Sequence, residues 1–120
     1  MTIATTRIDG ETAVITPSGD IDFHALPDLL SAGRHLPAFI TRVLWDFQHV
    51  SFMAVAGLHL LDHQRTSCRA LQRTLDVTGL NTQPRRLLKT AMEAIPEESW
   101  SDFLPTPRTA TGRTGSATAL

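Results

Sequence analysis

The sequence predicts an α/β fold: a mixed, mostly parallel four-stranded sheet with an antiparallel N-terminal strand and packed helices. The main observation is that short apolar runs alternate with amphipathic helical patterns from residue 12 to residue 94. Parallel strands need crossover helices of this kind between them. A second observation is Asp9-Gly10, which separates the first two apolar runs and favours a tight turn between antiparallel strands.

The first part of the chain is expected to form a hairpin followed by a helix. Strand patterns cover residues 3–8 and 12–16, on either side of Asp9-Gly10. Ser18-Gly19-Asp20 then ends the second strand. Leucines at helical spacing predict a helix over residues 24–35, with Pro27 in the first turn, where a missing backbone N–H is tolerated.

The middle of the chain is read as a buried strand that runs almost directly into a helix. The strand is expected over residues 42–47, where Val43, Leu44, Trp45 and Phe47 place apolar or aromatic side chains on both faces, which is typical of a strand covered on both sides. A helix is expected over residues 56–70, with Leu58, Leu61 and Leu71 as its apolar positions. Its start, at residues 54–56, lacks the Ser, Thr, Asp or Asn that normally binds the free N–H groups of a first turn.

A fourth strand and a third helix complete the predicted domain. Residues 73–77 alternate as a strand does, and residues 82–94 have a polar start, an early proline and apolar residues at helical intervals.

The boundary of the domain is expected near residue 104. A short helix over residues 96–104 would pack Trp100, Phe103 and Leu104 on the body. After Pro105 the chain has almost no bulky apolar residue, too few to offset the entropy of ordering it. We therefore assign residues 1–104 to one domain and residues 105–120 to a disordered tail.

Composition narrows the class of protein. A net charge of −1 lacks the basic excess that nucleic-acid binding usually needs, so nucleic acid is not an expected partner. No run of residues has the length and apolarity of a membrane span or a leader, which predicts no membrane partner and a cytoplasmic protein. Cys68 is the single cysteine and cannot form an internal disulfide, consistent with a reducing compartment.

Two short motifs carry a resemblance to a known family. Gly19-Asp20-Ile21-Asp22 follows the second strand, and Phe52-Met53-Ala54-Val55-Ala56-Gly57-Leu58 joins the buried strand to its helix. With the order of elements, these motifs resemble the STAS family, named for sulphate transporters and anti-sigma factor antagonists. The resemblance covers roughly residues 3–94 and implies the STAS fold.

The resemblance also implies a function without catalysis and without a cofactor. In anti-sigma factor antagonists the turn usually reads Asp-Ser-Ser-Gly-Leu, and its second Ser is phosphorylated by the partner. Here Ala54, Val55 and Ala56 replace those three polar residues. The implied partner is an anti-sigma factor, a serine kinase of the histidine-kinase-like ATPase fold, bound without a phosphorylation switch at Ala56. The expected partner-binding residues are Asp20, Asp22, Met53, Ala54, Val55, Ala56 and Gly57.

Other interpretations of the same residues stay open. The chain could be a scaffold component that assembles with other STAS proteins. His59 and His63, four residues apart on a helix, could bind a metal or small molecule with Asp22, although the sequence places no third ligand beside them. Ser51 is the one hydroxyl near the turn, and we interpret it as structural and not as a substitute phosphorylation site.

Overall fold

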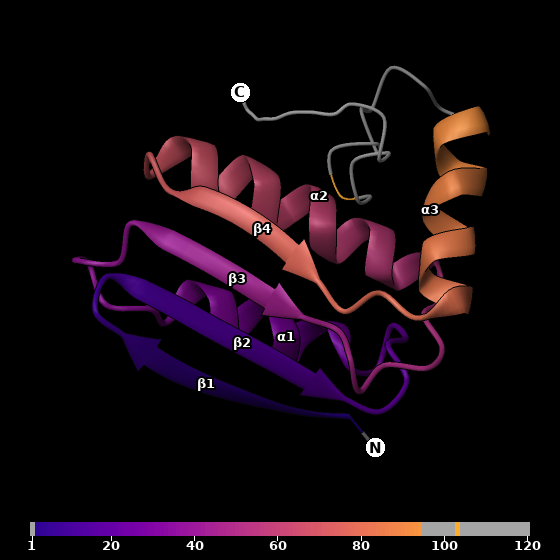
Figure 1. Cartoon of the computed structure of the whole chain (residues 1–120), viewed down its shortest axis with the longest axis horizontal. Coiled ribbons are helices and arrows are strands. Elements are labelled where there is room, and N and C mark those ends of the chain that lie inside the picture. Colours follow the sequence, from indigo (N-terminus) through magenta and orange to yellow (C-terminus); the bar gives the residue numbers. More distant parts are fainter. Residues whose placement is uncertain (1, 95–102, 104–120) are drawn as a thin grey trace.

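The structure, a computed structural model, describes residues 2–94 and Phe103. Four strands and three helices follow one another in the predicted order (Figure 1). In chain order they are β1 Ile3–Asp9, β2 Thr12–Ser18, α1 Leu26–Arg34, β3 Arg42–Asp46, α2 Val55–Ala70, β4 Thr74–Thr78 and α3 Thr82–Ala94. The predicted fold class is confirmed.

The four strands form one sheet in the order β1-β2-β3-β4. β1 pairs antiparallel with β2, from Ile3 opposite Ser18 to Asp9 opposite Thr12. Gly10 makes the turn between them with φ +63°, a left-handed conformation that glycine adopts without strain. β2 with β3 and β3 with β4 are parallel pairs, as the crossover helices require.

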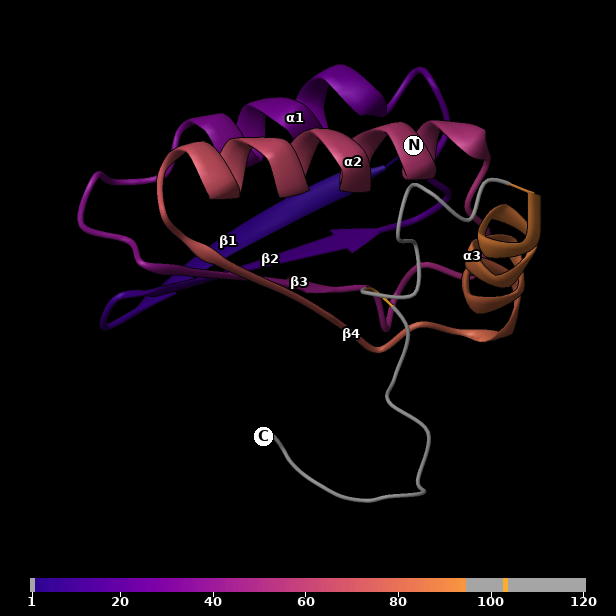
Figure 2. The same cartoon turned by 90° about the horizontal axis from the view of Figure 1, so that it is seen from above.

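Both α1 and α2 pack on the same face of the sheet, while α3 lies near the carboxyl ends of the parallel strands (Figure 2). Val43, Trp45 and Phe47 point from the central region of the sheet into the core beneath these helices and are almost fully buried. The expectation that β3 is covered on both faces is wrong for the part of the chain described here. Leu44, which points the opposite way, is only half-buried because no described helix lies on that face.

The buried stripe of α2 differs from the predicted one. Leu60, Leu61, Gln64 and Cys68 face the core, whereas Leu71 is 57% exposed. Gln64 is 3% exposed, and its side-chain oxygen accepts a hydrogen bond from the indole N–H of Trp45 at 3.3 Å. The same side chain fills the space above Gly33 of α1, where an added Cβ would lie 2.5 Å from Gln64 Nε2. A glutamine therefore occupies a core position that pattern reasoning gives to an apolar residue.

Phe103 packs back on the domain, as predicted. It is 6% exposed, and the guanidinium carbon of Arg65 lies 5.2 Å from the centre of its ring. The remaining residues of the predicted helix over 96–104 and of the predicted tail over 105–120 lie outside the described residues. Within the described part of the chain, no helix has the length and apolarity needed to cross a membrane.

Candidate functional site

The two motifs that are separate in the sequence lie side by side in the structure. Ile21 forms a parallel bridge with Met53. The N–H of Ile21 donates to the carbonyl of Phe52 at 3.1 Å, and the N–H of Ala54 donates to the carbonyl of Ile21 at 2.8 Å. The segment after β2, with Asp20 and Asp22, is thereby joined to the turn between β3 and α2.

α3 contributes the other partner of this turn. The N–H of Met53 donates to Gln83 Oε1 at 2.7 Å, and Gln83 Nε2 donates to the carbonyl of Met53 at 3.0 Å. Sequence reasoning missed Gln83, because a polar residue in the first turn of an amphipathic helix gives no sign of which distant backbone it meets.

α2 begins without a capping side chain. Ala54 precedes the helix in an extended conformation, with φ −81° and ψ 179°, and no side chain of the described residues caps the first turn. No acidic residue stands in that turn either. Both features that usually stabilise a helix start are missing here, and the missing cap is the one that the sequence predicts.

Burial divides the turn residues into two groups. Met53 is 1% exposed and Ala56 is fully buried, and Gly57 is buried with them. The Met53 side chain fills the space beside Gly57, where an added Cβ would lie 2.1 Å from Met53 Cγ. Phe52 and Val55, by contrast, are 47% and 53% exposed. Of the expected partner-binding residues, Met53 and Ala56 therefore have buried side chains, and Gly57 has none to offer.

Exposed apolar and aromatic side chains surround the start of α2. We call Phe23, Phe52, Val55 and His59 the turn patch. Phe23 is 59% exposed, and its ring centre lies 5.7 Å from that of His59. Val55 and His59 are four residues apart and so share one face of α2. No sequence pattern places Phe23 in this group, because its contact with α2 arises only from the packing of the two helix starts.

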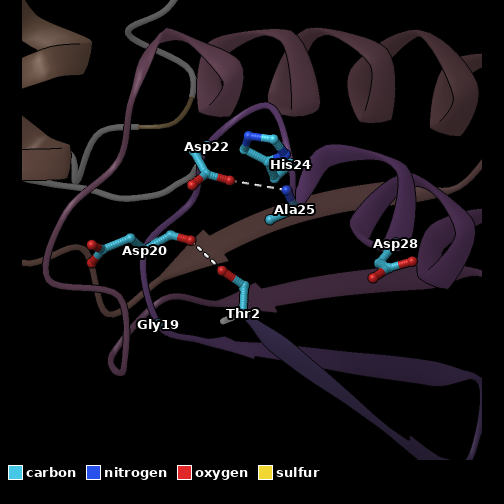
Figure 3. A pocket seen from close by; sticks show the side chains of 7 residues that line it. All are labelled: Thr2, Gly19, Asp20, Asp22, His24, Ala25 and Asp28. Atoms are coloured by element: carbon cyan, nitrogen blue, oxygen red, sulfur yellow. Dashed lines mark hydrogen bonds between the residues drawn. The ribbon is translucent and has the colours of Figure 1, made fainter.

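An open acidic depression of about 620 Å³ lies beside the motif that contains Asp20 and Asp22 (Figure 3). Asp22 is half-buried, and its Oδ1 accepts the N–H of Ala25 at 3.0 Å at the entry to α1. Asp20 is exposed, and its carbonyl accepts a hydrogen bond from the Thr2 hydroxyl. Asp28 lies at the opposite end of the depression from Asp20, so the carboxylates do not converge on one point.

The alternative candidates for a ligand-binding or phosphorylation site lie on α2 and in the loop before it. His59 and His63 are exposed on α2, and the ring of His59 lies against that of Phe23 at a tilt of 51°. Within the residues that the structure describes, no three His, Cys, Asp or Glu side chains come together as a metal site. Ser51 is exposed and precedes α2 by four positions. Cys68 is buried in the core, and burial raises the pKa of its thiol above the ordinary value. The nearby charge of Arg73 offsets only part of this rise, so the thiol is protonated at neutral pH.

Comparison with known proteins yields a family match and several structural neighbours. The model of the STAS domain family matches residues 3–94. The structure of the anti-sigma factor antagonist SpoIIAA in its unphosphorylated form has a TM-score of 0.67 at 17% identity, over 89% of this chain and 90% of SpoIIAA. An anti-sigma factor antagonist from Mycobacterium paratuberculosis also has a TM-score of 0.67 at 17% identity, over 85% of this chain and 94% of its own.

A further neighbour is much longer than this chain. The structure described as Mglu has a TM-score of 0.59 at 18% identity and aligns with 66% of this chain, which spans 20% of that protein. A search of curated proteins gives no significant match. At these identities the structural neighbours establish the fold, which is the one the chain shares with SpoIIAA.

Proposed function

The chain belongs to the STAS domain family, and we propose that it is a non-catalytic regulator of the anti-sigma factor antagonist type. Its partner would be an anti-sigma factor, a serine kinase of the histidine-kinase-like ATPase fold. By occupying that inhibitor in the cytoplasm, the protein would free a sigma factor or other client by competition. Structural neighbours described as anti-sigma factor antagonists support this proposal.

The observation that carries the proposal is the turn patch. Phe52 and Val55 expose apolar surface at a helix start, directly beside the segment that holds Asp22. Large apolar side chains grouped on a surface are typical of protein docking sites. Asp20 and Asp22 add negative charge at the edge of this patch, which favours a partner with basic residues around an apolar centre.

The proposed binding has no phosphorylation switch at the turn. A phosphate at the start of α2 would gain from the free N–H groups and the helix dipole, and would bring close to two negative charges. Ala56 has no hydroxyl to accept a phosphate, and its side chain is fully buried. The chain would therefore bind its partner constitutively, with the amount of protein setting the response.

The test is binding of the purified full chain to each anti-sigma factor kinase of the same organism, by titration calorimetry. Val55→Asp puts a charge in the turn patch, and we expect the affinity to fall at least about tenfold because that charge loses water in the contact. Thr66→Asp is the matched control, since it adds the same charge at an exposed position farther along α2. Equal affinity of all three proteins would contradict docking at the turn patch.

The scaffold interpretation rests on a different surface. β1 is an edge strand on which Ile3 is 60% and Ile8 is 41% exposed. Edge strands with exposed apolar residues can pair with a further chain. If wild-type protein binds none of the kinases but co-elutes with other STAS proteins, and Ile8→Lys abolishes that co-elution, the scaffold interpretation replaces the antagonist one.

A further inference from the structure

The backbone of the turn before α2 is held from two sides by groups outside it. Successive residues of an extended segment direct their N–H and C=O groups to opposite sides. Phe52 and Ala54 bond to the backbone of Ile21 on one side. Met53 faces the other side, where the Gln83 amide both accepts its N–H, at 2.7 Å, and donates to its carbonyl, at 3.0 Å. Gln83 thus takes the place of a neighbouring strand for one residue.

The turn cannot supply these contacts itself. The residues from Phe52 to Gly57 contain no side chain that donates or accepts a hydrogen bond, apart from the weak thioether of Met53, which is buried beside Gly57. The conformation of this segment therefore depends on its neighbours.

The segment that leads into α3 holds the preceding loop in the same way. Asn81 Nδ2 donates to the carbonyl of Gln48 at 3.1 Å and to that of Val50 at 2.9 Å. Two amide side chains from one short segment, at Asn81 and Gln83, thus bond to backbone groups between residues 48 and 53. The loop between β3 and α2 is attached to α3 through these side chains.

We propose that Gln83 is a positioning residue for docking. By clamping Met53, it fixes the directions in which Phe52 and Val55 leave the backbone on either side. A partner then meets a preformed turn patch and does not lose affinity in ordering the turn. The inference rests on the proposed function, and it adds that α3 controls the geometry of the docking turn.

The experiment compares Gln83→Met with wild type in the full chain. Methionine has nearly the length of glutamine but cannot form the two hydrogen bonds. We expect the Met53 amide to exchange its hydrogen about tenfold faster by NMR, while the Leu60 and Leu61 amides of α2 keep their rates. Thr82→Ala is the control at an exposed neighbouring position and should leave the Met53 exchange rate unchanged.

Gln83→Glu supplies a readout that a purely structural role would not give. A neutral carboxylic acid has one donor and one acceptor group and can replace the amide, whereas a carboxylate only accepts. While the carboxyl group of this variant is protonated, at low pH, the Met53 amide should be protected from exchange nearly as well as in wild type at the same pH. As the pH rises through the titration of that group, at about pH 4.3 for an ordinary glutamate, the bond to the Met53 carbonyl is lost and the charged oxygen repels that carbonyl, so the protection should fall even though the carboxylate can still accept the N–H.

The outcomes test two statements separately: that Gln83 holds the Met53 backbone through its two hydrogen bonds, which we call the clamp, and that this contact supports docking. An unchanged Met53 exchange rate in Gln83→Met would overturn the clamp. With a kinase that binds wild type, we expect the affinity of Gln83→Met to fall about three- to tenfold, chiefly through slower association. Faster exchange with unchanged affinity would overturn the positioning role. If no kinase binds wild type, the proposed function and the docking role fall together, while the exchange rates still decide on the clamp.

Discussion

The starts of α1 and α2 meet at the candidate site but are stabilised in different ways. Before α1 the polar group is local: Asp22 Oδ1 accepts the N–H of Ala25, the residue that precedes the helix, and Asp28 stands in the first turn, although no side chain of the described residues caps that turn. At α2 no local group of the described chain does this, and the turn is held by Ile21 and by Gln83 of α3. Because groups from distant elements fix the backbone at the start of α2, the residues there need no polar side chains. The exposed positions can carry apolar side chains such as Phe52 and Val55.

The largest expected effect on stability comes from introducing a carboxylate at either of two neighbouring positions at the start of α2, one buried and one exposed. Ala56→Asp buries a carboxylate without a partner in a fully buried position, which should lower the free energy of unfolding by at least about 3 kcal/mol. Val55→Asp lies on the exposed side, where the helix dipole favours an acid, and should change it by less than about 1 kcal/mol. Urea denaturation of both variants gives the comparison, and equal stabilities would mean that Ala56 is not buried as described.

The next effect tests how closely Met53 packs under the α2 start. Gly57→Ala places a methyl group where the structure leaves 2.1 Å to Met53 Cγ, so overpacking should cost roughly 1–3 kcal/mol of unfolding free energy. In a Met53→Ala background the same change should cost clearly less, because the clashing atoms are gone. A double-mutant cycle by urea denaturation measures the difference. Purely additive costs would contradict direct contact between these two positions.

A smaller effect is expected just before α1, where the charge of Asp22 and its hydrogen bond can be separated. Asp22→Ala should lower the free energy of unfolding by about 1 kcal/mol, because the Ala25 N–H loses its side-chain acceptor and keeps only the Asp22 carbonyl at 3.2 Å. Asp22→Asn keeps an acceptor and should change stability by only a few tenths of a kcal/mol. If the charge of Asp22 attracts the partner, both variants should bind more weakly by a similar factor in calorimetry. Weaker binding of Asp22→Ala alone would assign Asp22 a structural role only.

The sequence was sufficient for the sheet and for the proximity of the two motifs. Alternation of strands and helices predicts the parallel pairs, and Asp9-Gly10 predicts the hairpin, because these features follow from local patterns. The STAS resemblance predicts that Asp22 and the turn before α2 belong to one partner-binding surface. The bridge between Ile21 and Met53 shows that the two segments are neighbours. The missing cap of α2 could also be read directly from Ala54.

Features that depend on packing between distant elements could not be predicted. Met53 was expected at the surface, but its flexible side chain fits beside Gly57, where no other side chain competes for the space. Glutamine at position 64 is typical of a solvated helix face, yet the Trp45 indole gives its side chain a buried hydrogen-bond partner. Gln83 and Phe23 join the site through tertiary contacts alone. Each of these residue types occurs both in protein cores and on surfaces. Its location therefore depends on packing between elements that are distant in the sequence.

The smallest effect distinguishes two histidines on one helix. His59 contacts Phe23 in the turn patch, whereas His63, one turn farther along α2, is exposed outside the patch. His59→Ala and His63→Ala should each change the free energy of unfolding by less than about 0.5 kcal/mol, since both side chains are on the surface. Only His59→Ala should weaken partner binding, by about two- to fivefold, because it removes contact area at the edge of the patch and leaves Phe23 less fixed. Calorimetric titration of the partner with both variants is the measurement. Equal losses for the two variants would point to a general effect of α2 surface charge, and a loss for His63→Ala alone would move the docking surface away from the turn.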